Sequence, residues 1–182
     1  MRRSIKNLSH IPDFGKVVWS INQRARSTTL EMVREFAGAE LELFKEALME
    51  QDFPAFHEVP LSARWLARKA AANADLRTML ATHHYIESIK VFTEINRDGS
   101  VTIHVGFDRD ATARDLNGHP TNFPLYRVAQ IQEHGSAAAN IPPRPHWSVQ
   151  RQRMAAKAPA KRREIAEEIV RRVRADLRRT LR

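Results

Sequence analysis

Apolar residues recur at helical spacing through the first fifty residues of the chain. From Asp13 or Phe14 to about Glu50, eight apolar positions fall on one broad face at 100° per residue, and the charged residues lie mostly off it. The eight are Val18, Ile21, Ala25, Met32, Val33, Phe36, Phe44 and Ala47. The pattern predicts one long amphipathic helix, with a possible break or bend at Gly38, that ends at Asp52-Phe53-Pro54.

Two shorter helical segments are predicted next. Ser62 is suited to be the N-cap of a helix that runs to about Ala71, because its hydroxyl can accept a hydrogen bond from a free backbone N–H. One or two further helical turns are predicted from Ala74 to Ala81.

A β-hairpin is predicted in the middle of the chain. Tyr85 to Ile95 is apolar with imperfect alternation, and Val101 to Phe107 alternates cleanly, with Asp98-Gly99 as a tight turn between them. One face of the second strand carries Val101, Ile103, Val105 and Phe107. Because a lone hairpin is barely stable, this face is expected to pack against the long helix.

Asp108 to Pro124 is predicted to be a loop, with its turn at Asn117-Gly118-His119-Pro120. A helix from Tyr126 to His134 follows, and Gly135 is suited to end it because glycine tolerates positive φ.

Three prolines then define a connector, Ile141-Pro142-Pro143-Arg144-Pro145-His146-Trp147. Proline cannot donate a backbone hydrogen bond and favours extended neighbours, so the segment is predicted to be stiff and exposed.

The last helix has two contrasting faces. Seven apolar residues occupy an arc of about 160° at helical spacing, and five arginines project from the opposite side. The apolar residues are Ile165, Ala166, Ile169, Val170, Val173, Leu177 and Leu181, and the arginines are Arg171, Arg172, Arg178, Arg179 and Arg182. Glu167 with Arg171, and Glu168 with Arg172, stand at the spacing of helical ion pairs.

Together these elements predict an α+β fold in which the long N-terminal helix packs on a small antiparallel sheet. Residues 1–150 form the α+β domain and include the connector, and residues 151–182 form a basic helical extension.

Two blocks of the sequence resemble the neck and tail-completion proteins of tailed bacteriophages, a group that includes the virion morphogenesis proteins of Mu-like phages. The first block is Ile131-Gln132-Glu133-His134-Gly135-Ser136 followed by the connector. The second combines Pro60 to Lys69 with Leu80 to Ile89, in the same order as in that group. The chain departs from the group's pattern at Pro143, at His146-Trp147 and at His83.

The resemblance implies a structural protein of the virion: a neck subunit that forms a homo-oligomeric ring, joins head to tail or completes the tail, and contacts neighbouring connector and tail proteins. It implies no cofactor and no catalysis. Such a protein is made in the cytoplasm of the host bacterium and resides in the virion at the head–tail interface.

Arg144, Pro145, His146 and Trp147 are the candidate subunit interface. A guanidinium held between two prolines loses little freedom on binding, and a tryptophan can bury a large area. The alternative is that Trp147 folds onto its own core while Arg144 faces water.

Arg171, Arg172, Arg178 and Arg179 are the candidate contact with an anionic partner. Residues 151–182 contain 12 Lys or Arg against 4 Asp or Glu, whereas the rest of the chain is nearly neutral. The basic helix could contact packaged DNA without specificity, dock on an acidic subunit, or be only a solvated surface. The alternative function is therefore a DNA-binding protein that acts through this helix.

Evidence for other chemistry is thin. The chain has no cysteine, which excludes disulfides, thiolate zinc sites and a cysteine nucleophile. Its eight histidines form no H-E-x-x-H motif, and adjacent His83 and His84 point in different directions. We expect no enzyme activity, no metal site and no membrane span.

Overall fold

A computed structural model describes residues 14–78, 83–97 and 100–180. The fold is α+β, as predicted. The elements are α1 (Phe14–Met49), α2 (Pro54–Glu58), α3 (Ala63–Ala71), α4 (His84–Glu87), β1 (Lys90–Ile95), β2 (Val101–Gly106), β3 (Thr112–Arg114), β4 (Pro120–Pro124), α5 (Leu125–His134) and α6 (Trp147–Thr180).

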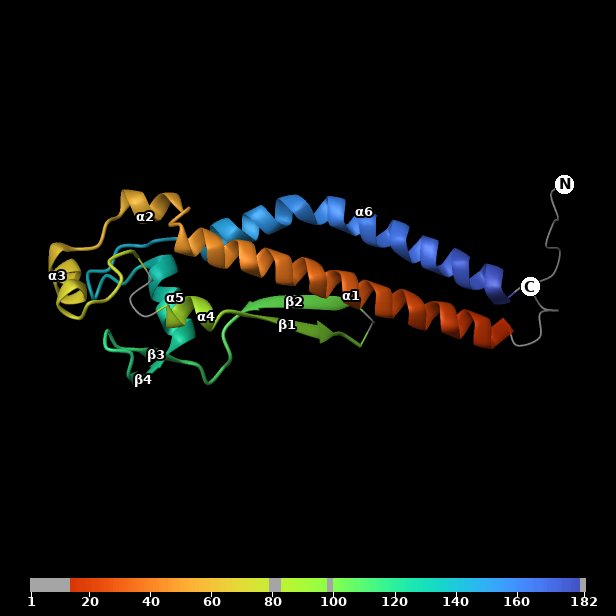
Figure 1. Cartoon of the computed structure of the whole chain (residues 1–182), viewed down its shortest axis with the longest axis horizontal. Coiled ribbons are helices and arrows are strands. Elements are labelled where there is room, and N and C mark those ends of the chain that lie inside the picture. The colour runs from red at the N-terminus through yellow and green to blue at the C-terminus, as the bar shows by residue number, and fades with distance from the viewer. Residues whose placement is uncertain (1–13, 79–82, 98–99, 181–182) are drawn as a thin grey trace.

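α1 and α6 form a long antiparallel helical hairpin (Figure 1). Ion pairs link the two helices far apart along their length: Arg24 of α1 lies 3.0 Å from Asp176, and Glu40 of α1 lies 2.7 Å from Lys157. The sequence boundary expected between residues 150 and 151 falls inside α6, which packs on α1 as one continuous helix.

Both long helices contain a residue that disfavours helix. α1 is continuous through Gly38, so the predicted long helix is confirmed and the possible break there does not occur. α6 continues through Pro159, which lacks the N–H needed for the helical hydrogen bond. Its bowed course in Figure 1 is the deformation expected from an interior proline.

β1 and β2 form the predicted antiparallel hairpin, with Lys90 opposite Gly106 and Ile95 opposite Val101. Its turn, Asp98-Gly99, lies outside the described residues. The prediction that the first strand begins at Tyr85 is wrong, because residues 84–87 form the short helix α4. Tyr85, Ile86 and Ile89 are all buried, and this spacing suits a helical turn rather than an alternating strand.

The region from Asp108 to Pro124 is not only a loop. It contains the two-stranded antiparallel sheet of β3 and β4, which the sequence failed to predict because the strands are short and irregular in register. The turn between them includes Gly118 at φ 85°, and the Asp115 carboxylate accepts hydrogen bonds from the backbone of Asn117 and His119.

The predicted cap of α3 is confirmed, because the Ser62 hydroxyl accepts a hydrogen bond from the Trp65 backbone N–H at 3.3 Å. The helical turn expected from Ala74 is wrong for residues 74–78, which are not helical. The remainder of that segment, residues 79–82, lies outside the described residues.

The core lies at one end of the helical hairpin, where the C-terminal half of α1 meets α2, α4, α5 and the start of α6 (Figure 1). Its buried apolar residues include Phe44, Leu48, Phe53, Ile89 and Leu125. β2 faces α1 as predicted, and Val105 packs on this core. The opposite end of the hairpin, with the N-terminal part of α1 and the C-terminal part of α6, extends beyond both sheets.

Candidate functional site

The connector between α5 and α6 is a closed backbone turn. Gly135 ends α5 with φ 74° and donates its N–H to Ile131 O at 2.8 Å. Ser136 and Ile141 then pair in an antiparallel bridge, with N···O distances of 2.7 and 2.9 Å. The sequence correctly placed the end of α5 at Gly135, and the bridge explains why the chain reverses direction there.

Arg144 binds the chain's own backbone. Its Nε donates to the carbonyl oxygen of Val59 at 2.8 Å and its Nη2 to that of Pro60 at 3.1 Å. The residue is only 4% exposed. The prediction of an exposed connector is therefore wrong at Arg144. The guanidinium neither is free to bind a partner nor faces water.

Glu133 of α5 caps the N-terminus of α6. Its carboxylate accepts hydrogen bonds from the backbone N–H groups of His146, Trp147 and Ser148 at 2.9–3.0 Å. The first N–H groups of a helix have no partner within the helix, and a negative charge there also interacts favourably with the helix dipole. One side chain thus fixes where α6 begins relative to α5.

The same hydrogen bonds shift the ionisation of Glu133. Burial alone raises the pKa of a carboxyl group, but the bonds from Ser148, His146 and Trp147 outweigh it and hold the pKa of Glu133 below its ordinary value. The group is therefore ionised at neutral pH.

His146, Tyr85 and Trp147 form a buried hydrogen-bond chain. The Trp147 indole N–H donates to the Tyr85 hydroxyl oxygen at 2.8 Å, and that hydroxyl lies 2.9 Å from His146 Nε2. His146 Nδ1 lies 2.9 Å from the carbonyl oxygen of Arg144. A neutral imidazole protonated on Nδ1 satisfies all three contacts, because Nε2 then accepts from the hydroxyl.

Aromatic packing completes the burial of this segment. The Trp147 ring lies edge-on to Phe44 of α1, with centroids 4.8 Å apart, and 5.8 Å from Phe107. His146 is 0% exposed, and Pro145 is half-buried. Of the four candidate interface residues, Arg144, His146 and Trp147 thus make their principal contacts inside the chain, because the bridge at Ser136 turns the connector inward.

Acid should destabilise the protein through His146. Burial lowers the pKa of His146 in the folded chain, so below an unfolded pKa of about 6.5 the unfolded state binds more protons than the folded state. We expect the free energy of unfolding to fall by up to about 1.4 kcal/mol per pH unit between that value and the lower folded pKa.

Urea denaturation at pH 7.5, 6.5 and 5.5 measures this effect, with His146→Gln as the comparison. Glu133 does not affect this measurement. Because its pKa is lowered in the folded chain, its contribution to stability is lost only in more acidic solution. Equal pH slopes for the wild type and His146→Gln between pH 6.5 and 5.5 would contradict the assignment.

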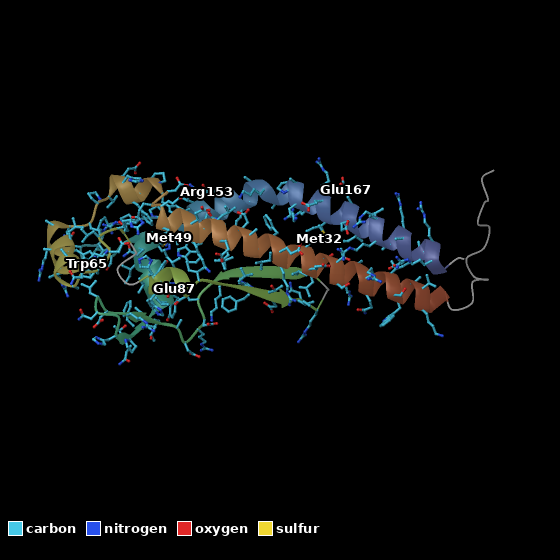
Figure 2. All side chains as sticks on the ribbon, viewed as in Figure 1. Met32, Met49, Trp65, Glu87, Arg153 and Glu167 are labelled. Atoms are coloured by element: carbon cyan, nitrogen blue, oxygen red, sulfur yellow. The ribbon has the colours of Figure 1, made fainter. Side chains whose placement is uncertain are left out.

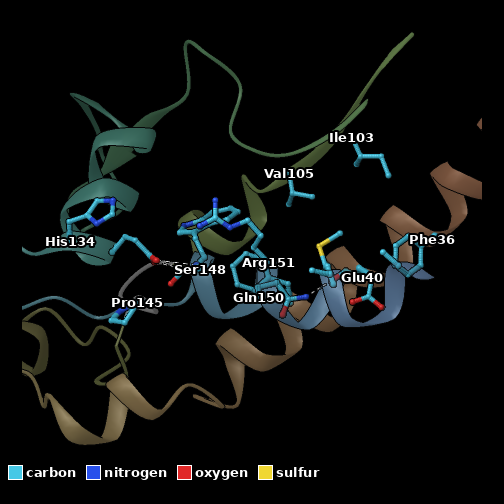
Figure 3. A pocket seen from close by; sticks show the side chains of 15 residues that line it. Phe36, Glu40, Ile103, Val105, His134, Pro145, Ser148, Gln150 and Arg151 are labelled. Carbon is cyan, nitrogen blue, oxygen red and sulfur yellow. Dashed lines mark hydrogen bonds between the residues drawn. The ribbon is translucent and has the colours of Figure 1, made fainter. Parts of the chain in front are cut away.

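A cavity of about 830 Å³ lies between α1, β2 and α6 (Figure 3). Its apolar lining includes Phe36, Phe44, Ile103, Val105, Trp147 and Met154. Glu40 in its wall is 4% exposed; one carboxylate oxygen lies 2.7 Å from Lys157, and the other has no hydrogen bond in the described part of the chain. This lining suits an apolar side chain better than acid–base chemistry.

The four arginines predicted to contact an anionic partner have different environments. Arg172 is half-buried and bonds Glu168 at 2.6 Å and Glu31 of α1 at 2.8 Å, so it belongs to the packing between α1 and α6. Arg171 bonds Glu168 rather than the expected Glu167, at 2.6 Å. Arg178 and Arg179 are exposed. Arg172 is therefore not available to an anionic partner as predicted.

The residues that the structure describes contain neither a metal-binding cluster nor a membrane-spanning helix. Those residues contain no cluster of three or more His, Asp or Glu side chains placed to hold a metal ion. Within the same ranges, no helix combines the length and apolarity that crossing a bilayer requires.

Comparisons of the chain with protein-family models, with curated proteins and with solved structures gave no match.

The sequence reasoning missed three residues that organise this site: Glu133, Tyr85 and Glu40. Glu133 belongs to the first block that resembles the phage proteins. It lies 14 positions before the first residue of α6, too far for the sequence to indicate that it caps this helix. The apolar pattern around Tyr85 predicts a strand, whereas the residue lies in α4. Glu40 lies near the apolar face of α1. An acidic residue close to an apolar face indicates a buried ion pair, so the sequence could have predicted this one.

Proposed function

We propose that this protein is a structural subunit of the neck of a tailed-phage virion, where it joins head and tail or completes the tail as part of a homo-oligomeric ring. It acts by contact with copies of itself and with neighbouring connector and tail proteins. No cofactor and no catalytic turnover belong to this role, and its place is the head–tail interface of the virion.

One observation carries the proposal: the sequence blocks that resemble the phage proteins meet in space. Pro60 from one block accepts a hydrogen bond from Arg144 of the other, 84 positions later. Tyr85 bonds Trp147, 62 positions later. These contacts give residues of both blocks a shared physical task, which is to hold the connector and the start of α6 against the segment before α3 and against α4. This supports treating the blocks as one motif.

The shape of the molecule supports an assembly role as well. The far end of the helical hairpin exposes Val18, Trp19 and Val170 at 43%, 66% and 46%. Large apolar side chains on a projecting helical hairpin are typical of a surface that another chain covers.

The proposal is tested in a phage that carries this gene, with an early stop codon introduced into it. We expect filled heads and separate tails by electron microscopy, and joined particles again when the protein is supplied from a plasmid. Normal, infectious particles without the protein would remove the proposal.

DNA binding is the second candidate function, and the exposed arginines of α6 favour it. Arg163, Arg174 and Arg178 are exposed and make no ion pair within the described residues. Binding of a fluorescent duplex of arbitrary sequence by the monomer, with an affinity that falls steeply with salt, would support this function in place of assembly.

A further inference from the structure

Two stripes of opposite charge lie on exposed parts of the long helices. The acidic stripe on α1 and the adjoining turn consists of Glu35, Glu42, Glu46 and Glu50. The basic stripe on α6 consists of Arg163, Arg171, Arg174 and Arg178. All eight residues are exposed, and each stripe spans an arc of roughly 80° at 100° per residue.

Most of these charges have no opposite charge within their own chain. In the acidic stripe, Glu42 lies 3.1 Å from Lys45, and the other three acids form no ion pair among the described residues. In the basic stripe, Arg171 shares Glu168 with Arg172, and the remaining three arginines are likewise without an ion pair in the part of the chain that the structure describes. Glu46 and Glu50 share a groove with Arg153 and Lys157 of α6, but no ion pair joins them among the described residues. Both stripes therefore keep exposed charge that a second molecule can meet.

The two stripes are offset along the molecule, and no ion pair joins them among the described residues. The basic stripe lies in the half of α6 that runs beside the N-terminal half of α1, as the pairs Glu31–Arg172 and Arg24–Asp176 show. Met32 and Glu167 lie near the middle of the hairpin in Figure 2, and Glu167 falls within the basic stripe. At 1.5 Å rise per residue, the centres of the stripes are about 20 Å apart along the hairpin.

The stripes match each other in length and in apolar content. Each extends over fifteen residue steps, which corresponds to roughly 22 Å of helix. The acidic stripe borders Leu43, which is 47% exposed, and the basic stripe borders Val170, which is 46% exposed. Two helices that pack through these faces would bury an apolar contact flanked by opposite charges.

We propose that the basic stripe of one copy docks on the acidic stripe of a second copy, so that copies associate head to tail. This inference rests on the proposed assembly function and names its contact surface. The two surfaces are different, so each copy keeps one free after pairing, and association continues until a ring closes or a filament grows.

A second copy fits the basic stripe better than nucleic acid does. Val170 lies between arginines in a shallow groove on α6, together with Ala166, Ala175 and the acidic Glu167. Contacts to DNA phosphates come from basic and polar groups, and an acid among them would be repelled. An apolar strip with mixed charge suits a helix of a protein partner.

The test uses charge reversal and its rescue in the full chain, with molar mass measured by light scattering at 50 and 500 mM NaCl. Arg174→Glu/Arg178→Glu reverses the basic stripe, and Glu46→Arg/Glu50→Arg reverses the acidic one. None of these four residues has an ion pair among the described residues, but Glu46 and Glu50 line a groove together with Arg153 and Lys157 of α6. Circular dichroism therefore checks that each variant folds before its molar mass is compared. Arg64→Glu/Arg68→Glu on α3 is the matched control for the basic reversal, since it makes the same change of charge at the same spacing.

We expect the wild type and the control to associate at 50 mM NaCl and to dissociate in high salt. Each reversal should weaken association by more than about tenfold, and the combination of both reversals in one chain should restore it. Association that persists in either reversal would overturn this contact while leaving the assembly function standing. A wild type that stays monomeric, with or without duplex DNA, would overturn both, and a monomer that binds DNA only through Arg174 and Arg178 would assign the stripe to nucleic acid.

Discussion

Trp147→Ala is expected to lower the free energy of unfolding by about 3–5 kcal/mol, the usual range when a packed aromatic is truncated. The substitution removes the ring that packs on Phe44 and Phe107. It also removes the indole N–H that donates to Tyr85, in a hydrogen-bond chain that continues to the buried His146. Loss of packing and loss of a buried hydrogen bond act in the same direction.

Trp19→Ala is the matched control, because Trp19 lies on α1 and is 66% exposed. Its substitution should change the free energy of unfolding by less than about 0.5 kcal/mol in the monomer. Chemical denaturation followed by circular dichroism measures both variants. A Trp147→Ala protein as stable as Trp19→Ala would return Trp147 to the role of a docking residue on a surface.

The long helices and the first hairpin were predictable because their signals are local. The apolar period of α1 and the clean alternation of β2 each arise from residues within one element. Such patterns predict the type of element even where Gly38 or Pro159 lowers the helix propensity. Packing of α1 and α6 against each other stabilises both helices at these positions.

The candidate site was predictable in position but not in orientation. Stiffness of the connector follows from its prolines, yet stiffness does not tell which way Arg144 points. The groups that hold Arg144 are the carbonyls of Val59 and Pro60, more than 80 positions earlier in the chain. No local pattern encodes a contact at that separation, so a buried arginine was mistaken for an exposed one.

The acidic stripe is a second feature that local sequence patterns do not fully predict. Of its glutamates, Glu42 and Glu46 are predicted to lie off the apolar face of α1, where the usual expectation is a solvated surface. Only the antiparallel arrangement of α1 and α6 shows that the centre of the basic stripe is offset along the hairpin from the centre of the acidic stripe. The proposed charge complementarity between copies therefore follows from the arrangement of the helices and not from any local pattern.

Gly135→Ala is expected to disrupt the connector, with a loss of at least about 3 kcal/mol of folding free energy from combined backbone strain and steric overlap. Gly135 has φ 74° and ψ −179°, a region that only glycine readily occupies. A Cβ atom there would lie 2.7 Å from the carbonyl oxygen of Ile141 and 2.9 Å from the nitrogen of Pro143. Both neighbours are backbone atoms of the bridged turn, so they cannot rotate away.

Gly38→Ala provides the contrast, because a Cβ at Gly38 has no atom within 4 Å and the residue is in the middle of α1. Alanine there should raise the free energy of unfolding by roughly 0.5–1 kcal/mol, since it restricts the unfolded chain and favours helix. Thermal denaturation of the two variants separates the effects by sign. If Gly135→Ala melts at the wild-type temperature, then the Ser136–Ile141 bridge does not fix the connector, and Arg144 and Trp147 are held in place by their side-chain contacts alone.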